Sequence, residues 1–183
     1  MTFLVALGGT TKQNSSTEKA LAAACRAAQA SGATLRMFDG SYISGLPHYG
    51  SSADGNAAGA EMVEAIRKAD GVIIASPGYH GSISGMMKNA LDYLEDLAQD
   101  ERPYLDSRPV GLIATAFGHQ AAMSTLLTLR TITHALRGWP TPMGAAIRTT
   151  AETFDSDGAI IDQSAKFQLD LVGQQVAKAA GRL

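Results

Sequence analysis

The sequence predicts a three-layer α/β protein with a five-stranded parallel sheet in the order 2-1-3-4-5 and helices on both faces. Short apolar runs alternate with longer segments of helical periodicity, which indicates repeated βα units. Several of these runs are apolar throughout, as expected for parallel strands buried on both faces. Five such units fit a doubly wound sheet. The chain has 183 residues, 45% of them hydrophobic, so it is long enough for one buried core, and we expect a single domain over residues 1–183.

In the first half of the chain, strands are predicted at residues 3–7, 34–38 and 72–75, and helices at residues 16–30 and 60–69. The first helix is rich in alanine, a strong helix former. The second places Met62, Ile66 and Ala69 on one face, opposite charged residues. The stretch 40–59 is rich in Gly, Ser and Asn, which predicts a loop.

In the second half, strands are predicted at residues 110–114 and 143–147, and helices at residues 84–97, 121–136 and 162–180. Met87, Leu91 and Leu94 recur at steps of three and four, which is typical of a helix with one buried face. The Trp-Pro-Thr-Pro segment at 139–142 interrupts the helical pattern, because proline cannot continue a helix.

Composition excludes several function classes. The formal net charge is −2, which favours neither nucleic acid nor an anionic membrane as a partner. No apolar run approaches the ~20 residues of a membrane span, and the first residues lack a basic leader, so a soluble, cytoplasmic protein is expected. Cys25 is the only cysteine; a buried thiol is favoured over a reactive one. No pair of histidines has metal-ligand spacing, so no metal is expected.

Three loops should meet where a ligand would bind, at the carboxyl ends of strands 1, 3 and 4. The loop at 8–17 combines small residues, hydroxyl and amide side chains and one cation, Lys12, before a helix N-terminus. This combination suits a phosphate group, although Ser15, Ser16 and Thr17 could also serve only to cap the helix. The loop lacks both the dinucleotide-binding and the Walker patterns.

The loops at 76–85 and 115–121 each carry an aromatic residue among small ones, Tyr79 and Phe117 respectively. Exposed backbone amides on a stiff Pro-Gly turn suit a flat heterocycle, while the alternative is an ordinary turn without a ligand. His80 and His119 lie on these loops and are candidates for hydrogen bonds to such a ligand.

The second loop, Ser-Pro-Gly-Tyr-His-Gly-Ser-Ile-Ser-Gly at 76–85 followed by Lys-Asn-Ala-Leu-Asp at 88–92, resembles the NAD(P)H-dependent FMN reductase signature, S-P-E-Y-N-G-S-I-P-G-x-L-K-N-A-L-D. The first loop resembles that family's phosphate loop, G-S-x-R-x-x-S-x-N, with Gly9, Thr10, Lys12, Ser15 and Thr17 on its marked positions. The chain departs from both motifs: Lys12 replaces arginine, Thr17 and Gly78 replace asparagine and glutamate, and His80 replaces asparagine. The resemblance implies a flavodoxin-like fold that binds FMN.

By this resemblance, Thr10, Lys12, Ser15 and Thr17 would hold the FMN phosphate, and the other two loops would line its ring. The full set of candidate cofactor-binding residues is Gly9, Thr10, Lys12, Ser15, Ser16, Thr17, Pro77, Gly78, Tyr79, His80, Gly81, Ser82, Ala116, Phe117, Gly118 and His119. No catalytic side chain is expected, because N5 of the flavin itself accepts hydride.

The expected function is an NAD(P)H-dependent flavin or quinone oxidoreductase, which passes electrons from NADPH or NADH through FMN to a small-molecule acceptor. A flavin-dependent monooxygenase is a candidate recipient of the reduced flavin. The alternative is a non-enzymatic electron carrier of the flavodoxin type, although such carriers tend to be strongly acidic. A phosphoacceptor signalling domain is excluded, because acidic residues are missing at the ends of strands 1 and 3. The leucine- and methionine-rich helices at 84–97 and 121–136 are expected to support a homodimer or homotetramer.

Overall fold

The structure, a computed structural model, describes residues 1–12, 14–51 and 56–182. Five parallel strands form one sheet in the order β2-β1-β3-β4-β5, so the predicted fold class and strand order are confirmed. The strands are β1 (Phe3–Gly8), β2 (Thr34–Phe38), β3 (Gly71–Pro77), β4 (Pro109–Ala116) and β5 (Trp139–Arg148).

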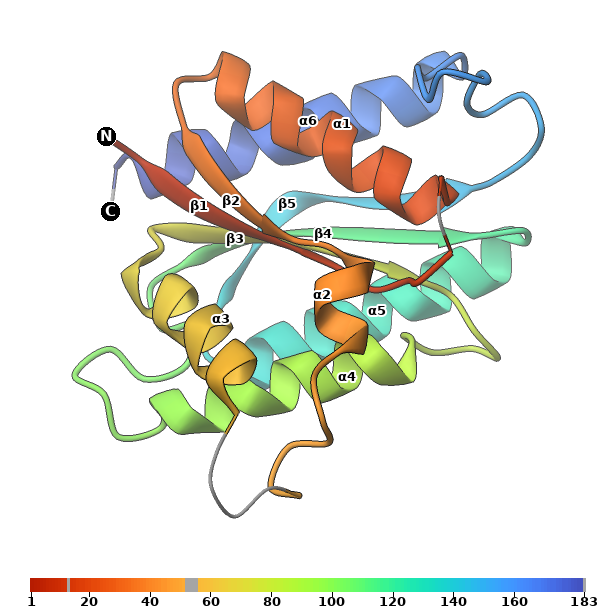
Figure 1. Cartoon of the computed structure of the whole chain (residues 1–183). Coiled ribbons are helices and arrows are strands. Elements are labelled where there is room, and N and C mark those ends of the chain that lie inside the picture. The colour runs from red at the N-terminus through yellow and green to blue at the C-terminus, as the bar shows by residue number, and fades with distance from the viewer. Residues whose placement is uncertain (13, 52–55, 183) are drawn as a thin grey trace.

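Helices cover both faces of the sheet (Figure 1). One face is packed by α1 (Ser16–Ala30) and α6 (Gln163–Ala180). The other face is packed by α3 (Ala57–Lys68), α4 (Gly85–Asp92), the 3-10 helix η1 (Tyr93–Leu97) and α5 (His119–Ala135), with the short helix α2 (Gly40–Ser44) beside them. Every residue of β3 and β4 is buried, because both faces of these central strands lie under helices. None of the described helices is both long and apolar enough to cross a membrane.

The carboxyl ends of the central strands lie in register at one edge of the sheet. Gly8 pairs with Ala75, Pro77 with Thr115, and Ala116 with Arg148. The loops that leave these strands therefore start side by side, as the doubly wound topology predicts.

Some boundaries differ from the prediction. Helix α2 lies inside the predicted loop 40–59, where the Asp39 side chain accepts a hydrogen bond from the Tyr42 amide and caps it. Residues 52–55 of that predicted loop lie outside the described residues. His119 is the first residue of α5 rather than a loop residue, while Pro77 and Ala116 end β3 and β4.

Strand β5 begins at Trp139, four residues before its predicted start, and includes Pro140 and Pro142. It is an edge strand that pairs only with β4, so an outward-facing position without an N–H costs no ladder bond. The register shifts between Val110 and Leu112 of β4, which accommodates this irregular start.

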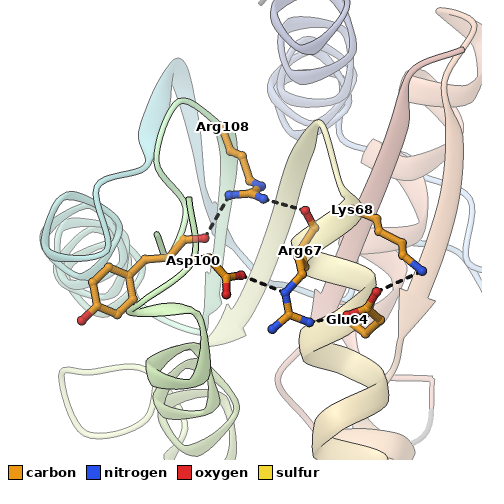
Figure 2. Close-up of polar contacts among 6 residues, drawn as sticks. Glu64, Arg67, Lys68, Asp100 and Arg108 are labelled. Carbon is orange, nitrogen blue, oxygen red and sulfur yellow. Dashed lines mark hydrogen bonds and ion pairs between the residues drawn. The ribbon is translucent and has the colours of Figure 1, made fainter. Parts of the chain in front are cut away.

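At the amino end of β4, the buried Arg108 side chain donates to three backbone carbonyls, two at the end of α3 and one in the segment before β4; two of these bonds are drawn in Figure 2. Its Nε donates to the Ala69 carbonyl at 3.0 Å, its Nη1 to the Tyr104 carbonyl at 3.0 Å, and its Nη2 to the Arg67 carbonyl at 2.8 Å. Burial lowers the pKa of Arg108 to about 10, so the guanidinium still carries its charge at neutral pH. The Arg67 guanidinium in turn pairs with Asp100 at 2.8 Å. This cluster therefore closes the C-terminal end of α3, away from the loops at the carboxyl ends of the strands.

Candidate ligand-binding site

The loops at the carboxyl ends of β1, β3, β4 and β5 surround a pocket of about 230 Å³. Its lining combines hydroxyl side chains with two aromatic and several small apolar residues. Its lining residues are Thr10, Lys12, Ser15, Ser16, Thr17, Pro77, Gly78, Tyr79, Thr115, Ala116, Phe117 and Thr149.

The polar side of the pocket is the N-terminus of α1. The Ser15 hydroxyl accepts the Glu18 amide at 3.1 Å and caps the helix. Ser16 and Thr17 open the helix, and the first amides of a helix have no partner within it. Lys12 adds an exposed cation to these donors, and the Thr10 hydroxyl accepts the Lys12 amide at 3.2 Å. A helix N-terminus beside a lysine is suited to a phosphate group.

The first and second loops are held together by buried serine hydroxyls. Ser84 Oγ donates to the Gly9 carbonyl at 2.7 Å and accepts the Met87 amide at the start of α4. Ser76 Oγ in turn accepts the Ser84 amide at 3.0 Å. These bonds tie the Gly9 carbonyl of the first loop to Ser84, and Ser84 to the end of β3 through Ser76. The two loops therefore keep a defined separation.

The second loop turns tightly between Tyr79 and Ser82, whose backbones exchange hydrogen bonds of 2.9 and 3.1 Å. The turn places His80 at φ 51° and Gly81 at φ 87°. Both central residues therefore lie in the left-handed region, which favours Asn-Gly pairs. Histidine is among the few side chains that adopt this region with some frequency, so His80 preserves the turn despite replacing asparagine.

A buried pair of hydroxyls joins the polar side of the pocket to β4. Thr17 Oγ1 and Thr115 Oγ1 lie 2.6 Å apart, and both residues line the pocket. One hydroxyl must donate to the other, so the pair retains one further O–H for a ligand. Thr17, predicted to hold phosphate, is therefore also a link between α1 and the sheet.

Gly78 lies against α5 with no room for a side chain. A Cβ atom at this position would lie 2.7 Å from Thr125 Oγ1 and 3.1 Å from the Ala121 carbonyl oxygen. The glutamate of the common motif would therefore require α5 to move. Glycine here lets α5 approach the second loop closely, and the Gly78 amide donates to the Thr115 carbonyl at 2.8 Å.

The structure brings most of the predicted site residues around this one pocket. Two lining residues, Thr115 and Thr149, were not predicted. Thr149 follows the fifth strand, and the shared edge of the parallel sheet is the signal that could have found it. The predicted residues outside the pocket lining are Gly9, His80, Gly81, Ser82, Gly118 and His119.

The predicted residues outside the lining lie on the same loops, except His119, which begins α5. Gly9 is buried, and its amide donates to the Ala75 carbonyl at 2.9 Å. His80 and Gly81 are exposed at the tip of their turn, and His119 is exposed at the start of α5. Gln13 of the first loop lies outside the described residues.

The residues present fit FMN. A phosphate suits the α1 N-terminus, and two aromatic residues of the second and third loops also line the pocket, where Tyr79 is 52% and Phe117 is 85% exposed. Exposure of a phenylalanine ring to this extent leaves apolar surface that a planar ring can cover. The described residues contain no cluster of three or more side chains suited to a metal ion.

Comparison with known proteins also indicates an FMN-binding protein. Residues 2–153 match the family model described as NADPH-dependent FMN reductase. An FMN-dependent NADPH-azoreductase of Staphylococcus aureus (strain USA300) is 34% identical over 109 residues, which make up 60% of this chain and 54% of the relative. The chain thus spans about half the length of the curated relatives it matches.

Solved structures show the same fold. FerB of Paracoccus denitrificans, a flavoenzyme NAD(P)H:(acceptor) oxidoreductase, superimposes with a TM-score of 0.78 at 21% identity, over 97% of this chain and 98% of that one. The apo form of an NADH:FMN oxidoreductase, EMOB, has a TM-score of 0.76 at 22% identity, over 97% of this chain and 89% of that one.

Proposed function

Because the chain belongs to the NADPH-dependent FMN reductase family, we propose that it is an FMN-containing oxidoreductase that uses NADPH or NADH to reduce a second, small-molecule acceptor. Bound FMN would supply the redox chemistry, since its N5 accepts a hydride and the reduced ring passes electrons on. The single observation that carries the proposal is the pocket itself. It brings a helix N-terminus, a lysine and two aromatic residues together at the carboxyl edge of the sheet.

The residues of the pocket would bind and orient. Lys12 and the first amides of α1 would hold the phosphate, while Tyr79 and Phe117 with the backbone of the second and third loops would line the ring. The hydrogen bond from Ser84 Oγ to the Gly9 carbonyl would keep the first and second loops at the separation that the cofactor needs. We assign no protein nucleophile, because hydride transfer to a flavin requires none.

The test is reduction of the flavin-loaded protein by NADPH and by NADH without oxygen, followed by addition of a quinone, an azo dye or free FMN. Bleaching of the flavin's visible absorbance by a nicotinamide donor and its recovery on addition of an acceptor are expected. A flavodoxin-type carrier would bind FMN but would not be reduced directly by either donor. That result would refute the enzyme and favour the carrier.

Binding of the cofactor is tested separately by Lys12→Gln. Loss of one charge-assisted contact should weaken FMN binding about tenfold, at about 1.5 kcal/mol for the contact. Binding of riboflavin, which has no phosphate, should not change. Equal weakening for both flavins would show that Lys12 does not contact the phosphate.

We also propose that two copies associate through α5. Met123 and Leu127 lie four residues apart on this helix, and their side chains are 50% and 53% exposed. Two large apolar side chains one turn apart would be buried by a second copy of the same face. Light scattering should give a dimeric or tetrameric mass, and Leu127→Glu should shift it to the monomer. A monomeric mass for the unmodified protein would contradict this proposal.

A further inference from the structure

Arg148, the last residue of β5, precedes the pocket-lining Thr149 and has no role in the proposed cofactor site. It pairs with Ala116 of β4 across the sheet, and the next residue, Thr149, lines the pocket. Its Nε donates to the Phe117 carbonyl at 3.3 Å. The guanidinium is therefore held beside the third loop, where Phe117 presents its exposed ring.

No neighbour in the described part of the chain neutralises the charge of Arg148. Among the described residues, no carboxylate lies within ion-pair distance of its guanidinium. The side chain is exposed, and only its Nε is bonded to the described part of the protein, so the two terminal nitrogens keep their donors for a ligand.

Among the described residues, the first loop and the end of β5 each bring one basic side chain to the border of the pocket, Lys12 and Arg148. Lys12 stands with the α1 N-terminus, where the cofactor's own phosphate is proposed to bind. Arg148 stands at the end of β5, where its Nε is bonded to the third loop and not, among the described residues, to the α1 N-terminus. The proposed FMN phosphate thus engages one cation and leaves the other for a second anionic group.

The two nicotinamide donors differ by one such group. NADPH carries a phosphate monoester on its adenosine ribose, with a charge of about −1.5 to −2 at neutral pH, and NADH does not. An arginine fork binds phosphate oxygens through two parallel N–H bonds, which gives geometric preference as well as attraction. We propose that Arg148 binds this 2′-phosphate and makes the protein prefer NADPH over NADH. The inference rests on the proposed function, because it concerns the donor of that reaction.

The direct test measures equilibrium binding to the FMN-loaded protein by calorimetry, with 2′,5′-ADP and 5′-AMP as probes that differ only in the 2′-phosphate. The unmodified protein should bind 2′,5′-ADP about tenfold more tightly, the scale of one charge-assisted contact. Arg148→Gln should bring this ratio close to one, and Arg148→Lys should retain part of it.

The matched control is Arg182→Gln, which removes the same charge from an exposed position beyond the end of α6. This control should leave the ratio unchanged. If the affinity ratio fell equally in both variants, the preference for 2′,5′-ADP would come from the overall charge of the protein, and the inference would be overturned. Equal weakening of both probes by Arg148→Gln would overturn it too, because the 2′-phosphate would not be the group recognised.

Steady-state kinetics supply the second readout. Arg148→Gln should raise the KM for NADPH about tenfold and leave the KM for NADH and both kcat values within about twofold. FMN fluorescence must show unchanged cofactor retention, because Arg148 also anchors the Phe117 carbonyl. Weaker FMN binding would mean that Arg148 only positions the third loop. If neither donor reduces the unmodified protein, the proposed function fails, while the calorimetric ratio still decides the role of Arg148.

Discussion

Gly40, the first residue of α2, controls the position of the first loop. A Cβ atom at this position would lie 1.5 Å from the Thr10 carbonyl oxygen and 2.4 Å from the carbonyl carbon. Ordinary van der Waals contact begins at 3.4 Å, so Gly40→Ala must displace the Thr10 carbonyl by about 2 Å. The displaced atoms are backbone, which cannot swing aside as the end of a flexible side chain can.

The displacement should weaken FMN binding selectively. Thr10 and Lys12 line the polar side of the pocket, so a 2 Å movement removes one or two phosphate contacts. At about 1.5 kcal/mol for each charge-assisted contact, the affinity for FMN should fall about 10- to 100-fold. Riboflavin should bind almost as well as before. The strain should also lower the free energy of unfolding by about 1–3 kcal/mol.

The assay is a titration of apoprotein with FMN and with riboflavin, followed by flavin fluorescence, with urea unfolding to confirm the fold. Gly85→Ala is the matched control, because a Cβ at this first position of α4 meets nothing within 4 Å. The control should change neither affinity by more than about twofold, which corresponds to about 0.4 kcal/mol. The reasoning is refuted if folded Gly40→Ala keeps its FMN affinity, or if riboflavin binding falls by the same factor.

Three further predictions concern stability. Thr17→Val should lower the free energy of unfolding by about 1–3 kcal/mol, because it leaves the buried Thr115 hydroxyl without its partner at 2.6 Å. The double variant Thr17→Val/Thr115→Val should lose less than the sum of the single variants in urea unfolding, and strict additivity would argue against the bond. Arg108→Met should cost about 3 kcal/mol or more, since three carbonyls lose their donor; an unchanged Tm would contradict the role given to this side chain. Burial raises the pKa of the Cys25 thiol from 9.0 to about 12, so the thiol should react with a disulfide reagent only after unfolding. The folded state holds the neutral thiol, so the free energy of unfolding should fall as the pH rises above about 9. Cys25→Ala should flatten this slope, and an identical slope in both proteins would assign the loss to other groups.

Local patterning alone was enough for the architecture. The apolar runs and the helical periodicity identified five βα units, and a parallel sheet requires the strands to end at a common edge. That rule by itself places the first, second and third loops together. The predicted element boundaries that were wrong are those that depend on how an element packs against its neighbours in the sheet. Pro140 and Pro142 argue against a strand, but an edge strand bonded only to β4 accepts them.

The residues of the candidate site also divide into those that the sequence predicts and those that only the structure shows. Lys12, Ser15 and Tyr79 could be nominated from their chemistry and from the motif around them, because these side chains act from loops next to their own strands. Thr149 and Arg148 lie in no motif, so only the position of β5 in the sheet could point to them, and the pairing of β5 with β4 places Thr149 in the pocket lining with Arg148 beside it.

Only the tertiary structure shows where two backbone segments approach each other closely at a glycine. Gly40 touches Thr10 and Gly78 touches α5 through contacts between segments far apart in the chain. A glycine in a sequence gives no indication of which distant backbone will occupy the space its missing side chain leaves. The fold class therefore follows from periodicities that repeat along the chain, whereas the fine shape of the pocket depends on non-local packing that no local pattern encodes.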